Sequence, residues 1–404
     1  MKKQNVLMIG CGKLGLPCAE VMSRFHNIQG YDITPFSSQH VEYTNDLKNA
    51  IIKNDIIFIA VPTPHDKNYG GEKPTAHLEP KDFDYSYIIS VLKQIHKHIT
   101  LKQTVVLIST VLPGTIRNYF KPFINSKNFI YNPYLIAMGS VKEDMVSPEC
   151  IIVGNYNGKH NYHSKKIINF YKQITINKPE VNFGTWEEAE SIKIFYNTFI
   201  SLKLSFVNMV QDVAQSIGNI NVDVVVDALK NAKQRIVSTK YMTPGLGDGG
   251  ACHPRDNIAL RFLAKKQDLG YDLFQSIVES REQQMRNIAK YVAKIHKKTK
   301  LPIVIHGMTY KSGVVYSNGS CSLLIEHYLH TLNCKCLCVD PLLERNNITP
   351  TTPSIVFLAH PASNTNSLYF KPRKGSIIID PWRKFNIKTR NYTVLHYGNT
   401  RELC

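Results

Sequence analysis

Long apolar runs are missing from this sequence of 404 residues. Its apolar segments, such as residues 56–61 and 105–111, stop far short of the ~18 residues that a membrane helix needs. We therefore expect no membrane span and no membrane partner. The apolar stretch that begins at Val6 is interrupted by Gly10, Gly12 and Gly15, which is too early for a secretory signal.

A disulfide framework is also missing. The nine cysteines are an odd number without repeated spacing, in a chain long enough to build its core without disulfides. This usage favours a reduced, cytoplasmic setting. Cys334, Cys336 and Cys338 recur at every second residue and so lie on one face of a predicted strand, but no Cys-x-x-Cys spacing accompanies them. The pattern favours burial, and we expect no metal site.

Acidic residues are few relative to basic ones: 31 Asp and Glu against 49 Lys and Arg give a net charge of +18. This charge fits three kinds of partner, namely nucleic acid, an anionic membrane or small substrates that carry phosphates. No basic helix with interleaved aromatic residues and no zinc-finger spacing accompanies it. We therefore expect a small phosphorylated substrate and no nucleic-acid partner.

The length predicts two or three domains at about 150 residues each. Short apolar runs alternate with helical patterns at the start of the chain, in residues 5–9, 55–61, 104–109 and 129–131, and again in residues 303–307, 335–339, 355–359 and 376–379. Between them lie the helical stretches 187–210, 221–230 and 272–298. We predict an α/β protein with two Rossmann-like, doubly wound parallel-sheet domains, 1–184 and 296–404, joined by a helical central domain, 185–295.

A glycine-rich turn follows the first predicted strand and opens a helix. In this context the first glycine permits a tight turn, the second admits a pyrophosphate and the third allows close packing of helix and strand. Asp32 ends the next predicted strand, where its carboxylate suits a ribose 2′-hydroxyl, so NAD is favoured over NADP. The predicted cofactor-binding residues are Gly10, Gly12, Lys13, Leu14, Gly15 and Asp32, with Val61, Pro62, Thr63 and Thr110 at the carboxyl ends of later strands.

A second glycine-rich segment, residues 245–256, contains a thiol beside charged groups. Cys252 has His253, Arg255 and Asp256 as neighbours, and basic neighbours lower a thiol pKa and favour the nucleophilic thiolate. Taken alone, the segment fits a nucleophile or an inert core cysteine.

Together these motifs resemble the nucleotide-sugar dehydrogenases, the UDP-glucose and GDP-mannose dehydrogenase family, over nearly the whole chain. The matching segments are residues 10–19, 61–64, 109–115, 132–148, 189–208, 245–256, 310–311 and 340–341. The resemblance implies a four-electron oxidation of a sugar C6 alcohol by two NAD molecules, UDP-glucose to UDP-glucuronate for polysaccharide biosynthesis, through a cysteine thiohemiacetal and thioester. It also implies a homodimer.

The resemblance assigns catalytic roles to five residues. Cys252 captures the aldehyde, Asp256 transfers protons with a water, and Thr110 lies near the water and the nicotinamide. Lys193 and Asn197 are four residues apart on one face of a predicted helix, where they could stabilise an oxyanion together.

The resemblance also implies a substrate site. Its residues are Tyr134, Lys193, Asn197, Gly249, Lys311 and Arg235, the last reaching the sugar nucleotide from the partner subunit. The charges of Arg235 and Lys311 suit a diphosphate.

The sequence departs from the family where Tyr134 replaces a glutamate that is associated with water activation. A tyrosine is a poor base at neutral pH, which leaves Asp256, Glu190 or a water chain for the last step. Smaller departures lie at His253, Arg255, Val315, Tyr316 and Asn318. Two alternatives to an active four-electron enzyme therefore stay open: an impaired homologue that binds NAD and nucleotide sugar, and a two-electron hydroxyacid dehydrogenase, which would not need Cys252.

Overall fold

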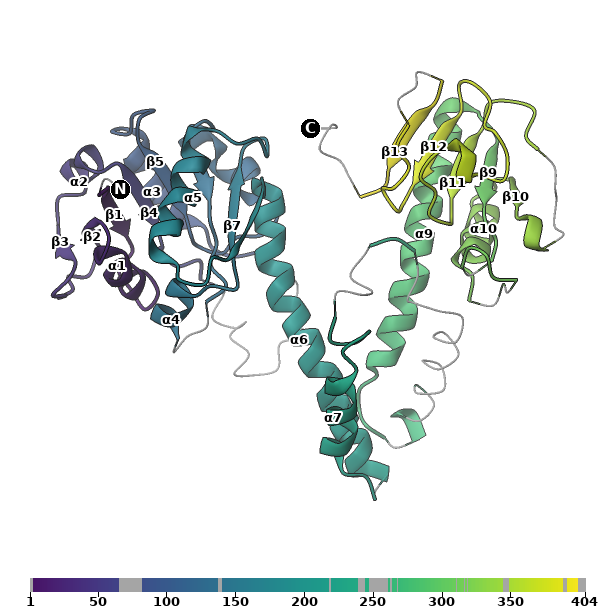
Figure 1. The fold of residues 1–404 in the computed structure, drawn as a ribbon, viewed down its shortest axis with the longest axis horizontal. Coiled ribbons are helices and arrows are strands. Elements are labelled where there is room, and N and C mark those ends of the chain that lie inside the picture. Colours follow the sequence, from purple (N-terminus) through teal and green to yellow (C-terminus); the bar gives the residue numbers. More distant parts are fainter. Residues whose placement is uncertain are drawn as a thin grey trace. The chain divides into compact units, whose positions relative to one another are not determined.

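The computed structural model describes residues 3–64, 82–136, 140–217, 219–238, 244–246, 261, 264–266, 268–309, 311–315, 317, 319–343, 349–387 and 391–398. The chain forms two compact units, Met1–Lys203 and Leu204–Cys404 (Figure 1). The boundary between them falls inside the long helix α6 (Trp186–Ile217). The division into three domains at residues 184 and 295 stays a prediction.

The first unit contains a sheet of eight strands in the order β3-β2-β1-β4-β5-β6-β7-β8. The strands are β1 (Asn5–Ile9), β2 (Asn27–Tyr31), β3 (Glu42–Tyr43), β4 (Ile56–Ile59), β5 (Thr104–Leu107), β6 (Phe129–Tyr131), β7 (Cys150–Asn155) and β8 (Glu180–Thr185). All neighbours are parallel except β6 and β7. The order of the first six strands is that of a dinucleotide-binding sheet, which confirms the predicted fold class.

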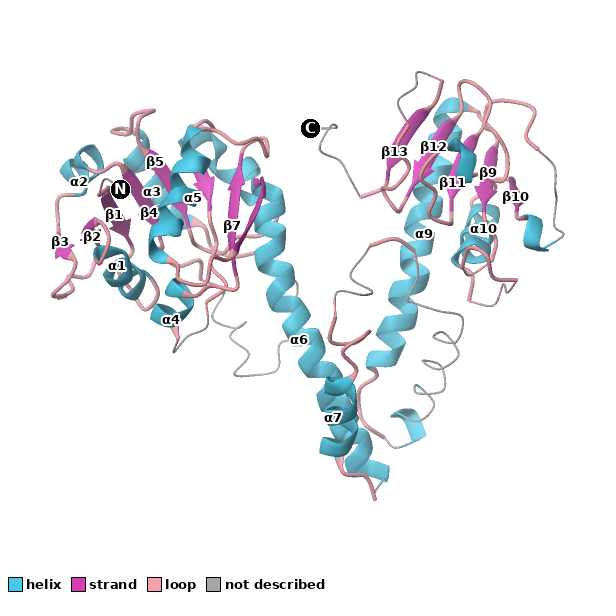
Figure 2. Ribbon diagram, viewed as in Figure 1, coloured by secondary structure: helices cyan, strands magenta, loops and turns pink. Residues whose placement is uncertain are grey.

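Helices cover both faces of this sheet (Figure 2). They are α1 (Gly15–Ser23), α2 (Leu47–Lys53), α3 (Ser86–His96), α4 (Val141–Val146), α5 (Tyr162–Ile174) and the start of α6, with short helical turns η2 (Ile116–Phe120) and η3 (Lys121–Phe123). Along β1, Val6 and Met8 belong to one apolar cluster, whereas Leu7 and Ile9 belong to the other. This alternation buries both faces of the strand, as expected of a parallel sheet.

The second unit begins with helices and ends with a sheet. Its helices are the rest of α6, α7 (Val222–Asn231), α9 (Leu273–Thr299) and α10 (Cys321–Thr331), with short turns η4 (Pro341–Leu343) and η5 (Thr365–Ser367). The strands are β9 (Ile303–His306), β10 (Cys336–Val339), β11 (Ile355–Leu358), β12 (Ile377–Asp380) and β13 (Thr393–His396). Their order is β10-β9-β11-β12-β13 and all are parallel, which is the second common doubly wound arrangement.

The two faces of the second sheet are covered differently. Helices α9 and α10 pack on one face, where they form a core with Ile305 and Phe357. On the other face, Phe370 and Phe385 from the connections between strands complete the core. Among the described helices of both units, none is long and apolar enough to cross a membrane.

Candidate active site

The glycine turn between β1 and α1 has the geometry of a dinucleotide site. Gly10 adopts φ +93° and donates a hydrogen bond from its N–H to the carbonyl oxygen of Tyr31 at 2.9 Å. A Cβ at Gly10 would lie 2.7 Å from the carbonyl carbon of Ala60, and one at Gly15 would collide with the carbonyl oxygen of Gly10. Both positions therefore require glycine. A Cβ at Gly12, by contrast, would meet no protein atom within 4 Å.

The N-terminus of α1 is arranged for an anion. Its first turn contains no acidic residue, and the N-cap residue Leu14 makes no side-chain capping hydrogen bond. Leu16 donates its N–H to the carbonyl oxygen of Gly12 at 3.2 Å and Pro17 has no N–H, so the amides that can donate to a phosphate are those of the glycine turn and of Gly15. Together with the open space at Gly12, this arrangement fits the pyrophosphate of NAD.

Asp32, at the end of β2, is bonded to the same turn. Its carboxylate accepts hydrogen bonds from the N–H of Cys11 at 2.7 Å and from the N–H of Thr34 at 3.0 Å. A carboxylate has further lone pairs, so these contacts leave acceptors for a ribose hydroxyl. Burial and the neighbouring Asp32 raise the pKa of the Cys11 thiol to about 12, and this cysteine is therefore unreactive.

The loops after β4 and β5 are bonded to each other at the same edge of the sheet. The Thr63 hydroxyl donates to the carbonyl oxygen of Thr110 at 2.9 Å, and the Ser109 hydroxyl donates to the carbonyl oxygen of Val61 at 2.5 Å. The predicted cofactor residues Val61, Thr63 and Thr110 thus lie on two loops that are held together. This edge lies beside the point where the strand order reverses between β1 and β4, which is where open parallel sheets bind ligands.

Glu190, in the first turns of α6, fixes the segment that follows Thr110. Its buried carboxylate accepts hydrogen bonds from the N–H of Gly114 at 2.5 Å and of Ile116 at 2.9 Å. Burial raises the pKa of Glu190 to about 7, and the two amides act in the opposite direction. Since each carboxylate oxygen accepts an amide, the structure favours a positioning role for Glu190 over the water-activating role that the sequence left open.

Lys193 is a buried cation one turn further along α6. Its side chain is only 9% exposed, and its Nζ donates to the carbonyl oxygen of Tyr134 at 2.7 Å. Burial lowers its pKa. Burying a charged ammonium costs desolvation free energy, and a negatively charged group bound next to it would offset that cost. Asn197, which is exposed, follows one turn later.

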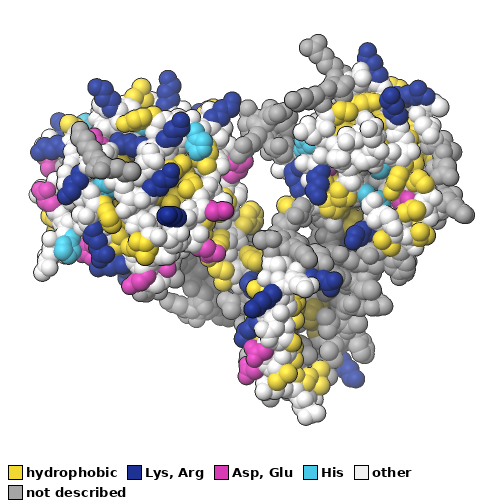
Figure 3. Space-filling model, viewed as in Figure 1, with side chains coloured by type: hydrophobic (Ala, Val, Ile, Leu, Met, Phe, Trp, Pro, Cys, Tyr) yellow, Lys and Arg dark blue, Asp and Glu magenta, His cyan; other side chains and the backbone are white. Residues whose placement is uncertain are grey.

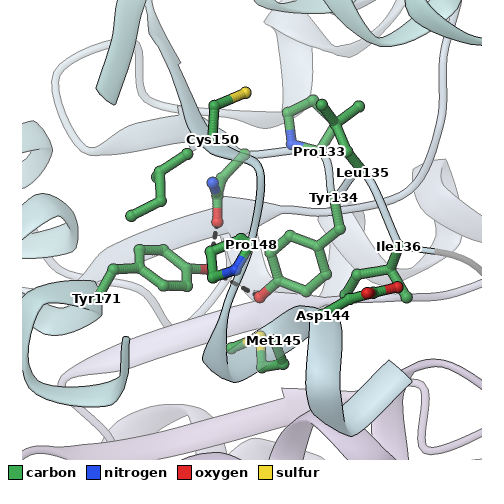
Figure 4. A pocket seen from close by; sticks show the side chains of 11 residues that line it. Pro133, Tyr134, Leu135, Ile136, Asp144, Met145, Pro148, Cys150 and Tyr171 are labelled. Carbon is green, nitrogen blue, oxygen red and sulfur yellow. Dashed lines mark hydrogen bonds between the residues drawn. The ribbon is translucent and has the colours of Figure 1, made fainter. Parts of the chain in front are cut away.

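The Tyr134 hydroxyl begins a chain of hydrogen bonds through Tyr171 and Asn132 in the first unit. It lies 2.7 Å from the hydroxyl of Tyr171 on α5, which donates in turn to Oδ1 of Asn132, and Asn132 donates to the carbonyl oxygen of Ile152 at 2.6 Å (Figure 4). Burial, followed by the proximity of Tyr171, raises the pKa of Tyr134 well above its ordinary value. The phenol is therefore not a base near neutral pH.

Beside this network lies a cavity of about 20 Å³, enough for roughly one water. Tyr134, Asp144 and Cys150 are among the residues that line it (Figure 4).

Several predicted site residues lie outside the described residues or in the other unit. Gly249, Cys252 and Asp256 fall in the undescribed segment 247–260. Arg235, after α7, and Lys311, after β9, belong to the second unit, and both are exposed. In the first unit the structure brings together the glycine turn, Asp32 and the loops of Thr63 and Thr110.

The second unit repeats the glycine turn of the first, a feature that the sequence patterns alone did not reveal. Gly307 follows β9 with φ +95° and donates to the carbonyl oxygen of Val339 at 2.9 Å. The N–H of Met308 donates to the carboxylate of Asp340 at 2.7 Å, as Cys11 does to Asp32. Thr309 donates to the same carboxylate at 3.1 Å. The signal in the sequence is a single glycine after an apolar run, paired with an aspartate after the next run.

Comparison with known proteins agrees with this geometry. Family models described as the NAD binding domain and the central domain of the UDP-glucose/GDP-mannose dehydrogenase family match residues 34–175 and 187–283. A UDP-glucose 6-dehydrogenase of Rickettsia prowazekii is 27% identical over 345 residues, 76% of this chain and 74% of the relative. A GDP-mannose 6-dehydrogenase of Pseudomonas putida is 25% identical over 347 residues, with the same coverage.

A solved structure shares the fold. The crystal structure of a ternary complex of GDP-mannose dehydrogenase from Pseudomonas aeruginosa superposes with a TM-score of 0.79 at 21% sequence identity, covering 96% of this chain and 99% of that one.

Proposed function

Because the chain belongs to the UDP-glucose/GDP-mannose dehydrogenase family, whose members carry out NAD-dependent oxidation of nucleotide sugars, we propose that it oxidises the C6 alcohol of a nucleotide sugar to a carboxylate, with UDP-glucose as the first candidate substrate. The observation that carries the proposal is the buried Lys193, which is held at the carbonyl of Tyr134 one helical turn from Asn197.

The overall reaction balances with two cofactor molecules and one water: R–CH₂OH + 2 NAD⁺ + H₂O gives R–COO⁻ + 2 NADH + 3 H⁺. Bound NAD supplies the hydride acceptor in each of the two oxidations. The glycine turn and Asp32 would hold its pyrophosphate and ribose, and the loops of Thr63 and Thr110 would lie beside the rest of the cofactor.

Lys193 and Asn197 would stabilise the charge that develops on the substrate oxygen. An ammonium carries three N–H donors, and the contact with Tyr134 occupies one of them. An alkoxide or hemithioacetal oxyanion that accepts a hydrogen bond from this ammonium would also neutralise the buried positive charge of Lys193. This stabilisation is greatest in the transition state and therefore accelerates the reaction.

Cys252 would form the covalent intermediate, a role that rests on the family resemblance. Its thiolate would attack the C6 aldehyde to give a thiohemiacetal, which loses the second hydride and becomes a thioester. Water would then hydrolyse the thioester. Asp256 with a bound water is the base that we favour, because the Tyr134 hydroxyl has a raised pKa and the Glu190 carboxylate accepts two backbone amides.

The sugar nucleotide would be held by cations. Lys311 follows the glycine turn of the second unit and Arg235 would come from a partner subunit, so that both could pair with a diphosphate. Lysine and arginine side chains are scattered over the face seen in Figure 3, interspersed with acidic ones, which supports a small substrate over a polyanion. A cytoplasmic role in polysaccharide biosynthesis belongs to the same proposal.

A homodimer is supported by an exposed apolar stripe on α6. Phe195, Phe199 and Leu202 recur at helical spacing on one face of its part in the first unit and are 64%, 45% and 49% exposed. Contiguous exposed apolar surface of this kind is typical of an association site. Sedimentation of the purified chain should give a dimer, and Phe199→Ser with Leu202→Ser should shift it towards monomer.

The second candidate is an impaired homologue that binds both ligands but turns over poorly, and the aromatic residue at position 134 favours it. A panel of UDP- and GDP-sugars with NAD separates the candidates. An active enzyme releases two NADH per sugar and forms a uronate. An impaired homologue binds NAD and a nucleotide sugar but releases NADH only slowly, and no NADH with any sugar of the panel would sink the enzyme proposal.

A further inference from the structure

Helix α10 and the edge strand β10 of the second unit bring three metal-binding side chains together. One ligand atom each from Glu326, His330 and Cys336 lies within 4.8 Å of the other two. Nε2 of His330 and Sγ of Cys336 are 4.0 Å apart. The cluster contains none of the residues assigned to the dehydrogenase site and does not depend on that assignment.

The local structure explains why these side chains meet. Glu326 and His330 are four residues apart on α10 and so share one face of the helix. On β10, Cys336 and Cys338 both belong to the core between the strand and the helices, whereas Val339 belongs to the core on the opposite face. The helix face and the strand face therefore converge on one point.

Cys338 follows Cys336 by two residues on the same face of β10 and belongs to the same core, so its thiol can serve as a fourth donor. The four side chains thus offer two sulfurs, one imidazole nitrogen and one carboxylate oxygen.

This donor set suits a tetrahedral Zn²⁺ ion. Zinc in proteins is bound by cysteine sulfur, histidine nitrogen and carboxylate oxygen, almost always with four ligands in structural sites. Hard cations such as Ca²⁺ and Mg²⁺ prefer oxygen ligands alone. Burial is graded across the cluster, because His330 is exposed, Glu326 and Cys336 are partly buried and Cys338 is buried. An ion can therefore enter from the side of His330.

We propose that Glu326, His330, Cys336 and Cys338 bind one structural zinc ion that ties β10 to α10. Binding replaces the two thiol protons, which are released to solvent. Strand β10 lies at the edge of its sheet and pairs with β9 alone among the described strands, so a link to the helix would restrain it. It leads directly into Asp340, which anchors the repeated glycine turn.

The test uses the full chain with Cys252→Ala in every sample, so that this thiol contributes no metal binding. Metal is removed with a chelator under reducing conditions, and Co²⁺ is added as a spectroscopic probe, followed by displacement with Zn²⁺. The expected result is one Co²⁺ per chain, with tetrahedral ligand-field bands and a thiolate-to-cobalt charge-transfer band, both lost when Zn²⁺ is added.

Variants locate the site. Cys336→Ser should remove the charge-transfer intensity of one thiolate, and His330→Asn, at an exposed position that leaves the core intact, should weaken Zn²⁺ binding at least ~10-fold. Cys334→Ser is the matched control, because Cys334 lies two residues from Cys336, outside the cluster, and its thiol is bonded to the carbonyl oxygen of Leu332. Absence of the charge-transfer band, unchanged binding in His330→Asn, or an equal loss in the control would overturn the proposal.

Discussion

Nζ of Lys193 lies 2.7 Å from the carbonyl oxygen of Tyr134, and this contact joins the helix that carries the proposed oxyanion donors to the loop where the family resemblance predicts a glutamate. The contact uses the backbone of Tyr134 and leaves its phenol bonded to Tyr171. Position 134 therefore orients Lys193 whichever side chain it carries.

Replacing Lys193 tests the oxyanion role. Lys193→Met keeps an apolar stem of similar length but removes the ammonium, so kcat should fall about 100–1000-fold while NAD affinity is unchanged. Lys203→Met is the control, because Lys203 is an exposed lysine on the same helix. Steady-state kinetics and NAD titration give both quantities, and equal rates in the two variants would refute the role.

Glu190 predicts a pH-dependent stability. Burial raises its pKa from 4.5 to about 7 on folding, so the folded chain binds a proton that the unfolded chain releases. The resulting stabilisation is complete below pH 4.5 and is lost as the pH rises through 7. The glutamine of Glu190→Gln does not titrate, so this variant does not share the loss. As the pH rises from 4.5 to above 7, the free energy of unfolding of the variant minus that of the parent should therefore increase by up to about 3 kcal/mol.

The two tryptophans allow this measurement in one unit at a time. Trp186 lies in the first unit and Trp382 in the second. In a Trp382→Phe background, the fluorescence of Trp186 reports urea unfolding of the first unit alone. Parallel stability curves for the parent and Glu190→Gln between pH 4.5 and 7 would contradict the assignment of the shift to Glu190.

Tyr134→Phe separates a structural role of the phenol from a catalytic one. The variant loses the hydrogen bond to Tyr171 but keeps the bond from Tyr171 to Asn132, so the free energy of unfolding should fall by about 1 kcal/mol. The pH profile of kcat should not change. Tyr171→Phe, which loses both bonds, should destabilise more. A shifted pH profile with unchanged stability in Tyr134→Phe would show that the phenol takes part in the reaction.

Slow thioester hydrolysis is expected because the glutamate is missing at position 134. During steady-state turnover, intact-mass spectrometry should detect a uronyl adduct on the chain, which is absent in Cys252→Ala. If the adduct is absent from the active parent enzyme as well, hydrolysis is not the slow step.

The helices and strands can be predicted from the sequence because the spacing of apolar residues within each short segment indicates which of the two it forms. Residues 129–131 form a strand with the predicted limits. Cys334 and Cys338 are buried in one core as predicted, but β10 begins only at Cys336, and Cys336 is only partly buried against that core. The side-chain partners could not be predicted in this way. Glu190 meets Gly114, and Glu326 approaches Cys336, only because helices pack on particular sheet edges. The spacing of residues along the chain does not contain that information.

The most direct test of the central claim is to measure how many NADH molecules are released for each molecule of sugar consumed. Purified enzyme with limiting UDP-glucose and excess NAD should release two NADH for each UDP-glucuronate formed, with no free aldehyde, and Cys252→Ala should form no uronate. One NADH per sugar with a free aldehyde or ketone product, or an unchanged uronate yield in Cys252→Ala, would contradict a four-electron oxidation through a covalent cysteine intermediate.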